Sequence, residues 1–138
     1  MTGKTTVRPR PCPTCPYRRD VPSGIWAPEE YAKLPLYDLT TGEQAEAGAV
    51  APFHCHSTPD KLCAGWVGCH DMEENLALRI HHSSIDPAVY DYQCPVPLFD
   101  SGADAAEHGM RDLENPGPEA KAKAEKLTKL IEKRSRYE

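Results

Sequence analysis

The chain has 138 residues and a net charge of −5, a length typical of one domain, and its 14 prolines and 9 glycines predict much irregular backbone. No apolar run approaches the length of a membrane-spanning helix, and the basic N-terminus lacks the apolar stretch of a secretory signal. The sequence therefore predicts a cytoplasmic protein with no membrane partner, whose six cysteines are thiolate ligands or buried thiols rather than disulfides.

The charges are distributed unevenly along the chain. Residues 1–20 carry five Lys or Arg against one acidic residue, residues 119–138 carry seven against four, and residues 21–118 carry four against sixteen. Acidic surfaces keep proteins soluble and basic helices are readily solvated, which is the simpler explanation of this pattern. The alternative is that the basic ends contact a protein or nucleic-acid partner.

In chain order, residues 1–11 mix Thr, Gly, Arg and Pro without an apolar period, which predicts a disordered basic arm. Pro28, followed by two glutamates, predicts a short helix that stops at Pro35. Residues 40–52 are expected to form a flexible connection. The next predicted helix begins at about residue 63 or 66. Its buried face is expected to carry Cys69, Met72, Leu76 and Ile80.

The last third of the chain predicts three further elements. Asp86 and Pro87 begin a short turn or helix, and Ser101 with Asp104 predicts the capped start of a helix of about two turns. Residues 116–138 predict an amphipathic basic helix. Residues 12–115 are therefore expected to form the metal-binding domain, a small α+β fold that is mostly α-helical and irregular and is organised around a Cys-rich site.

The stretch CPTCPYRRD places Cys12 and Cys15 at the spacing that lets one tight turn direct two sulfurs at one metal ion or cluster. A structural zinc ion takes four ligands, so two more are expected from the segment FHCHSTPDKLC. The favoured set adds Cys55 and Cys63. His56 is the alternative to Cys55 and would give a site with three cysteines and one histidine.

The identity of the metal is open at this point. Zinc is the favoured ion, and an iron–sulfur cluster is the alternative, because proline directly follows both Cys12 and Cys15 as it does in ferredoxin-type runs. Cys69 and Cys94 are interpreted as packed thiols rather than ligands. A redox role for the CPTC pair would need a preceding strand and a long following helix, which the sequence does not predict.

Enzyme signatures are scarce. The sequence has no phosphate-binding loop, no GxSxG, no GxGxxG and no zinc-deaminase pattern. The predicted function is therefore that of a zinc-binding module with a binding or regulatory role. The alternatives are an iron–sulfur redox or sensor protein, and a zinc-dependent hydrolase or nuclease with an open metal position.

The segments RPCPTCPYRRDVPSGIW, EEYAKLPLYD, FHCH and LCAGWVGCHD together resemble an uncharacterised, cysteine-rich family of actinobacteria and the phages that infect them. The resemblance covers residues 8 to about 115 and implies a phage-related role without naming an activity. It is strongest in a short skeleton, CxxCP, an aromatic-x-Cys-His and Cys-Ala-Gly, which implies the same candidate ligands. In this chain the skeleton corresponds to Cys12, Cys15, Cys55, His56 and Cys63.

Overall fold

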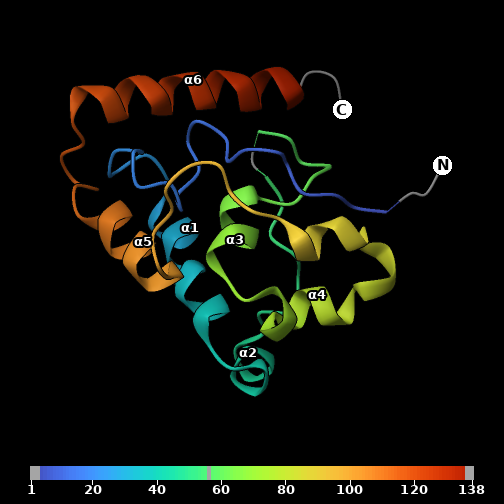
Figure 1. Ribbon diagram of the computed structural model, residues 1–138. Helices are drawn as coiled ribbons and strands as arrows, with labels where there is room; N and C mark the ends of the chain where they lie inside the picture. The colour runs from blue at the N-terminus through green and yellow to red at the C-terminus, as the bar shows by residue number, and fades with distance from the viewer. Residues whose placement is uncertain (1–3, 56, 136–138) are drawn as a thin grey trace.

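The computed structural model describes residues 4–55 and 57–135, with only the backbone of residues 134 and 135. Short helices joined by irregular segments form the body of the molecule, and one longer helix lies along its side (Figure 1). The α-helices are α1 (Pro28–Ala32), α2 (Thr41–Ala47), α3 (Ala64–Cys69), α4 (Leu76–Ile80), α5 (Gly102–Met110) and α6 (Pro118–Ser135). The 3₁₀ helices are η1 (Leu34–Asp38), η2 (Met72–Glu74), η3 (His82–Ser84) and η4 (Pro87–Asp91).

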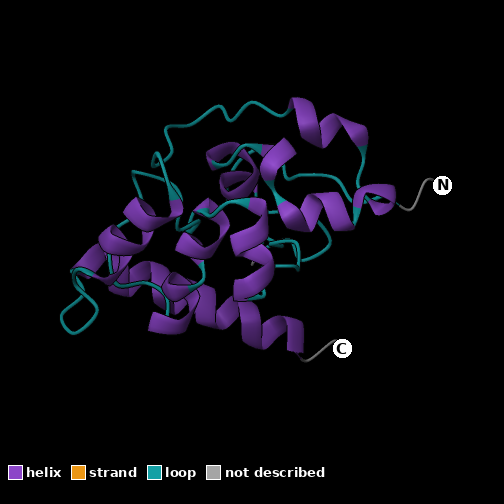
Figure 2. Cartoon of the chain, turned by 90° about the horizontal axis from the view of Figure 1, so that it is seen from below, coloured by secondary structure: helices purple, strands orange, loops and turns teal. Residues whose placement is uncertain are grey.

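The prediction of a mostly helical and irregular domain is confirmed. In the described residues, the β component of the predicted α+β class is confined to isolated bridges, and no strand is drawn for them in Figure 2. The bridges join Thr5 to Ile85, Val7 to Leu62, Arg18 to Leu98 and His54 to Leu62. None of the described helices is long and apolar enough to cross a membrane.

The segment before the cysteine pair differs from the predicted disordered arm. Leu62 N–H donates to the Thr6 carbonyl (2.9 Å), and Arg8 N–H donates to the Leu62 carbonyl (3.1 Å). Thr5 N–H donates to the carbonyl of Ser84 (2.7 Å). The composition of this segment shows that it has few apolar residues. It does not show which distant residues offer hydrogen-bond partners to its backbone. The difference concerns residues 4–11, since residues 1–3 lie outside the described part.

The prediction of a flexible connection over residues 40–52 is wrong, because most of this segment forms α2. The Thr40 side chain accepts from the Glu43 N–H (3.3 Å), and the Glu43 carboxylate accepts from the Thr40 N–H (3.2 Å). This capping box satisfies free N–H groups at the start of α2. The helix ends at Gly48, whose φ of 77° is a conformation that favours glycine.

The continuous helix predicted from about residue 63 is wrong, because the segment is divided into α3, η2 and α4. The Asp71 side chain caps η2, and the Asn75 side chain caps α4 by accepting from the Leu78 N–H (3.2 Å). Each cap starts a new helix in a new direction. Ile80 is 53% exposed, so it does not belong to a common buried face.

The helix α5 packs closely on α1 and η1. Ser101 caps it as predicted, by accepting from the Asp104 N–H (3.0 Å). The helix ends at Met110, and Gly109 lies inside it with the Tyr31 ring close to its Cα. Any side chain at Gly109 would overlap that ring.

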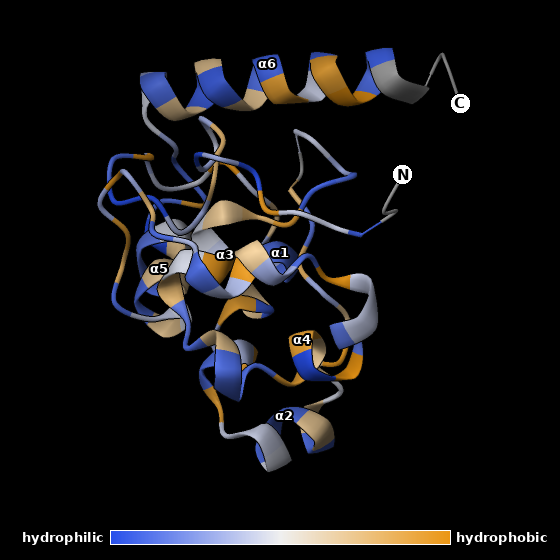
Figure 3. Cartoon of the chain, turned by 45° about the vertical axis from the view of Figure 1, so that its right-hand side comes forward, coloured by the Kyte–Doolittle hydropathy of each residue, from blue (hydrophilic) through white to orange (hydrophobic). Residues whose placement is uncertain are grey.

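The basic helix α6 is packed against the rest of the chain. Ala120 and Leu127 are buried and Ala124 is half-buried against the core, whereas Leu130 is exposed. Apolar residues recur along α6 in Figure 3, as the amphipathic pattern predicted. The packed side of α6 lies close to the loop that carries Cys12 and Cys15, because Leu127 and Thr14 line one cavity.

Candidate metal centre

The CPTC segment forms a tight turn. Cys15 N–H donates to the Cys12 carbonyl (3.0 Å), and Arg18 N–H donates to the Cys15 carbonyl (3.1 Å). The indole N–H of Trp26 donates to the Thr14 carbonyl (2.8 Å) and so fixes the turn from outside. Cys12 and Cys15 are 3% and 0% exposed, so the turn directs both side chains into the interior.

The second cysteine pair comes from a short hairpin. Cys55 N–H donates to the Lys61 carbonyl and Cys63 N–H donates to the Phe53 carbonyl, each at 2.8 Å. These two bonds place Cys55 and Cys63 on opposite arms of the hairpin, and both cysteines are buried. Cys63 is also the residue directly before α3, so it links the hairpin to a helix.

Two of the four sulfurs are in direct contact. Cys15 Sγ lies 3.7 Å from Cys63 Sγ. Two thiolates on one tetrahedral zinc ion, with zinc–sulfur bonds of about 2.3 Å, are about 3.8 Å apart. A Cβ on Gly65 would lie 2.5 Å from Cys15 Sγ, so only glycine leaves room for this sulfur.

Cys12 interacts with the other hairpin cysteine. Its interaction with the Cys55 side chain lowers the pKa of Cys12 to about 5, against the effect of burial, and the Thr14 and Ser57 side chains act in the same direction as Cys55. Cys12 Sγ lies 3.7 Å from Thr14 Oγ1. The same interaction with Cys12, together with burial, raises the pKa of Cys55.

Backbone N–H groups are directed at the sulfurs. Burial raises the pKa of Cys15, and the Cys63 and Cys12 thiols add to this effect, but the Tyr17 N–H opposes it. The Thr14 N–H acts in the same way on Cys12. The N–H groups of residues 57 and 58 do so on Cys55. Such donors stabilise negative charge on sulfur, which is the form that binds metals.

The four cysteines thus belong to the buried core and interact as two pairs, Cys12 with Cys55 and Cys15 with Cys63. Over residues 4–55 and 57–135, no three Cys, His, Asp or Glu side chains have an arrangement that could hold a metal ion. His56, the alternative ligand, lies outside the described residues. We call the four cysteines the thiol cluster.

The sequence profile of DUF6283, a family of unknown function, matches residues 7–134. The chain belongs to this family. The prediction that the chain belongs to an uncharacterised family is therefore confirmed. No curated protein and no solved structure matches the chain.

The remaining two cysteines of this DUF6283 chain have other contacts. Cys69 Sγ donates to the Phe99 carbonyl (3.4 Å), and Cys94 Sγ donates to the Val96 carbonyl (3.3 Å). Burial, followed by the charge of Asp38, raises the pKa of Cys69 to about 12. All six cysteines are free thiols.

The DUF6283 chain also contains an Asp38–His70 pair that sequence reasoning did not find. His70 Nε2 lies 3.0 Å from Asp38 Oδ1, and His70 Nδ1 lies 2.8 Å from the Trp66 carbonyl. Asp38 also accepts from the N–H groups of Gly102 and Ala103 (2.7 and 2.8 Å). The contacts of Asp38 join residues 32, 64 and 65 positions apart, so no local spacing signals them.

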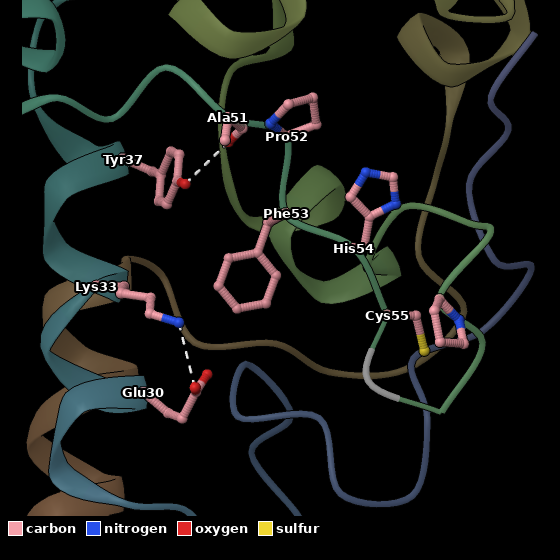
Figure 4. Close-up of a pocket in the computed structure, with 9 residues that line it drawn as sticks. Glu30, Lys33, Tyr37, Ala51, Pro52, Phe53, His54 and Cys55 are labelled. Carbon is pink, nitrogen blue, oxygen red and sulfur yellow. Dashed lines mark hydrogen bonds and ion pairs between the residues drawn. The ribbon is translucent and has the colours of Figure 1, made fainter. Parts of the chain in front are cut away.

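An open pocket of about 540 Å³ lies next to Cys55 (Figure 4). Phe53 and Tyr37 form its aromatic wall, and their rings are nearly perpendicular at a centroid distance of 6.1 Å. Lys33 and Glu30 form an ion pair at its edge (3.2 Å). This pocket could admit a ligand near the thiol cluster, and its lining also includes the His54 imidazole and the Cys55 thiol.

Proposed function

We propose that the thiol cluster binds one zinc ion and that the chain serves as a small binding or regulatory module. The observation that carries this proposal is the 3.7 Å separation of Cys15 Sγ and Cys63 Sγ, which matches two thiolates on one tetrahedral ion. The backbone N–H groups directed at the other sulfurs add support, because they are the usual surroundings of metal thiolates.

Zinc would act as a structural staple in this proposal. The four cysteines come from a turn near the N-terminus and from a hairpin about 40 to 50 residues later, so one ion would tie together segments that are distant in sequence. An irregular α+β fold organised around such a site gains folding energy directly from metal binding. Zinc binding in this proposal requires that the two pairs move onto a common centre.

The burial of all four sulfurs favours this structural role over a zinc-dependent hydrolase or nuclease. A catalytic zinc ion keeps a position open to water or substrate. Cys12, Cys15, Cys55 and Cys63 are each at most 3% exposed. A site enclosed in this way holds the fold and leaves the surface to do the binding.

A [2Fe–2S] cluster is the second candidate, with a redox or sensor role. The observation that favours it is the arrangement of the sulfurs as two pairs, Cys12 with Cys55 and Cys15 with Cys63. In such a cluster four cysteines are shared between two irons. Two thiolates on each iron would match the two neighbouring pairs of cysteines. The pairs would not have to move onto one centre.

The proposed setting follows from the thiols and from the sequence resemblance. Six free cysteines suit a reducing compartment, so we place the module in the cytoplasm. The resemblance to proteins of actinobacteria and their phages supports a role in a phage or host process. The exposed basic side chains at the two ends of the chain would then contact the protein or nucleic-acid partner.

Anaerobic purification followed by elemental analysis and an absorption spectrum tests the proposal. We expect a colourless protein with about one zinc per chain. Cys15→Ser should lose the metal and unfold at a lower temperature, whereas Cys94→Ser should keep both metal and stability. Equal metal content in the two variants would overturn the assignment. A brown protein that contains iron and sulfide would mean that the cysteines bind an iron–sulfur cluster instead of zinc.

A separate pair of variants tests whether Cys55 or His56 is the third ligand. Cys55→Ser should release zinc if the buried thiol is the ligand, and His56→Ala should then retain it. The reverse result would exchange Cys55 for His56 and leave the remaining three ligands unchanged.

A further inference from the structure

A second cavity, of about 260 Å³, lies between α6 and the turn that carries Cys12 and Cys15. Its apolar wall is formed by Pro13 from the turn and by Leu127 and Leu130 from the helix. Because water occupies about 30 Å³ per molecule, this volume corresponds to about eight or nine non-hydrogen atoms. The cavity is thus suited to a molecule smaller than most drug-sized ligands.

The polar side chains that line the cavity are all hydrogen-bond donors. Lys123 and Lys126 come from α6, Thr14 comes from the CPTC turn and Ser57 comes from the hairpin. Each of these groups can donate a hydrogen bond, and none of the described lining residues carries a carboxylate. Two ammonium groups and two hydroxyls around an apolar space favour a negatively charged head group on an apolar body.

Asp20 interacts with Lys123 but does not neutralise it. Lys123 acts on Asp20, but the effect is the smallest of those that lower the pKa of this carboxyl, and the Arg18 side chain has the largest. Arg18 holds both oxygens of the Asp20 carboxylate, each at 2.8 Å. In the described part of the chain, Lys126 forms no ion pair.

We propose that this cavity binds a small organic anion with a short apolar body. The anionic group would lie among Lys123, Lys126 and the two hydroxyls, and the apolar part would contact Leu127 and Leu130. The site goes beyond the proposed metal function, since none of its lining residues belongs to the thiol cluster.

The position of the cavity gives its occupant a structural effect. Thr14 and Ser57 line the cavity, and the same two side chains interact with the Cys12 thiol. A bound anion would therefore bridge α6 to the turn and hold the helix over Cys12. Reagents that modify thiols should then reach Cys12 more slowly in the presence of the anion.

Hexanoate, which has eight non-hydrogen atoms, is the probe for the test. It is titrated into the full-length protein and followed by NMR of the backbone amides and by calorimetry, with hexylammonium as the probe of opposite charge. We expect a Kd on the order of 1 mM for hexanoate, with shifts around residues 14, 57 and 123–130, and at least tenfold weaker binding of hexylammonium. Equal binding of the two probes, or shifts elsewhere, would overturn the proposal.

Matched variants of α6 complete the test. Lys123→Gln with Lys126→Gln removes both ammonium groups from the cavity and should weaken hexanoate binding at least tenfold. Lys121→Gln with Lys129→Gln changes the net charge equally on the same helix, but neither residue lines the cavity, so it should leave binding unchanged. Equal loss in both pairs would mean non-specific attraction and would refute the site.

Metal content is measured in the same samples, so that a failure of the anion site can be distinguished from a failure of the zinc site. Binding of hexanoate to a chain that is purified without metal would uphold the anion site and overturn the zinc site. A zinc-loaded chain that does not bind hexanoate would uphold the zinc site and overturn the anion site.

Discussion

Cys15 can reach Cys63 only because residue 65 is glycine. A Cβ at that position would lie 2.5 Å from Cys15 Sγ and 2.6 Å from the Cβ of Tyr17. The sulfur therefore occupies space that every other residue would fill with its own side chain. The Cys-Ala-Gly run of the sequence thus has a packing explanation in addition to the ligand role proposed for its cysteine.

Gly65→Ala should lower the free energy of unfolding by about 1–3 kcal/mol, the usual cost of overpacking a core, and should reduce metal content. The measurement is denaturant unfolding alongside elemental analysis. Gly42→Ala is the matched control, since Gly42 lies in α2 with nothing within 4 Å of an added Cβ. The control should be neutral or more stable by up to about 1 kcal/mol. Similar losses in both variants would contradict the packing explanation.

Trp26 should stabilise the CPTC turn through its indole N–H. Trp26→Phe removes the 2.8 Å bond to the Thr14 carbonyl and leaves that buried oxygen without its donor, which should cost about 1–3 kcal/mol in addition to the lost volume. The same variant should release metal faster to a chelator.

Trp66→Phe separates the hydrogen bond from the volume change. Trp66 is fully buried, and its N–H has no hydrogen-bond partner in the described residues, so phenylalanine removes volume and an unsatisfied donor. If Trp66→Phe releases metal as fast as Trp26→Phe, the bond to Thr14 is not what fixes the turn.

Asp38 should make the fold sensitive to acid. Burial tends to raise the pKa of this carboxyl, but the hydrogen bonds from His70 and from the N–H groups of Gly102 and Ala103 lower it below its ordinary value. A group whose pKa is lower in the folded state stabilises the fold above its unfolded pKa of about 4, and this contribution is lost as the pH falls through the folded value.

Asp38→Asn should therefore be less stable than the wild type at pH 7, and the difference should shrink as the pH falls below about 4. Unfolding curves between pH 7 and pH 2 measure this difference. Asp91→Asn is the control, because Asp91 is exposed and should change stability little at any pH. A constant deficit of Asp38→Asn across the whole range would show that its charge is not involved.

Docking of α6 should depend on Leu127. Leu127→Ala removes a side chain that is 7% exposed and should cost about 2–3 kcal/mol. Leu130→Ala, at a position 37% exposed, should cost less than about 1 kcal/mol. Proteolysis of the native protein reports the difference, since a released α6 is cleaved first; equal cleavage of the two variants would argue against this docking contact.

The four cysteines could be named as candidate ligands from the sequence, whereas the polar contacts of Asp38 could not be predicted. Cys12 and Cys15 are close in sequence, and cysteine is a residue type whose spacing carries a geometric meaning. Asp38 offers no such signal, because its partners lie 32, 64 and 65 residues away and are a histidine and two backbone N–H groups.

Two predictions of secondary structure are wrong although the deciding residues are visible in the sequence. The start of α2 was readable, since Thr40 and Glu43 have the spacing of a capping box, but the glycines around them favoured a loop. In residues 64–80 the apolar periodicity predicts one helix, but the capping residues Asp71 and Asn75 each start a new helix. The pairing of Thr6 with Leu62 depends on tertiary structure alone.

The separation of 48 positions between Cys15 and Cys63 also sets an order of events during synthesis. At about 5–20 residues per second, a ribosome needs about 2–10 s to add them, and during that time the CPTC thiols have no partner. The first half of the chain leaves the ribosome with its reactive sulfurs uncovered. Nascent chains of this protein should therefore depend on cellular thiol reductants until the hairpin is complete.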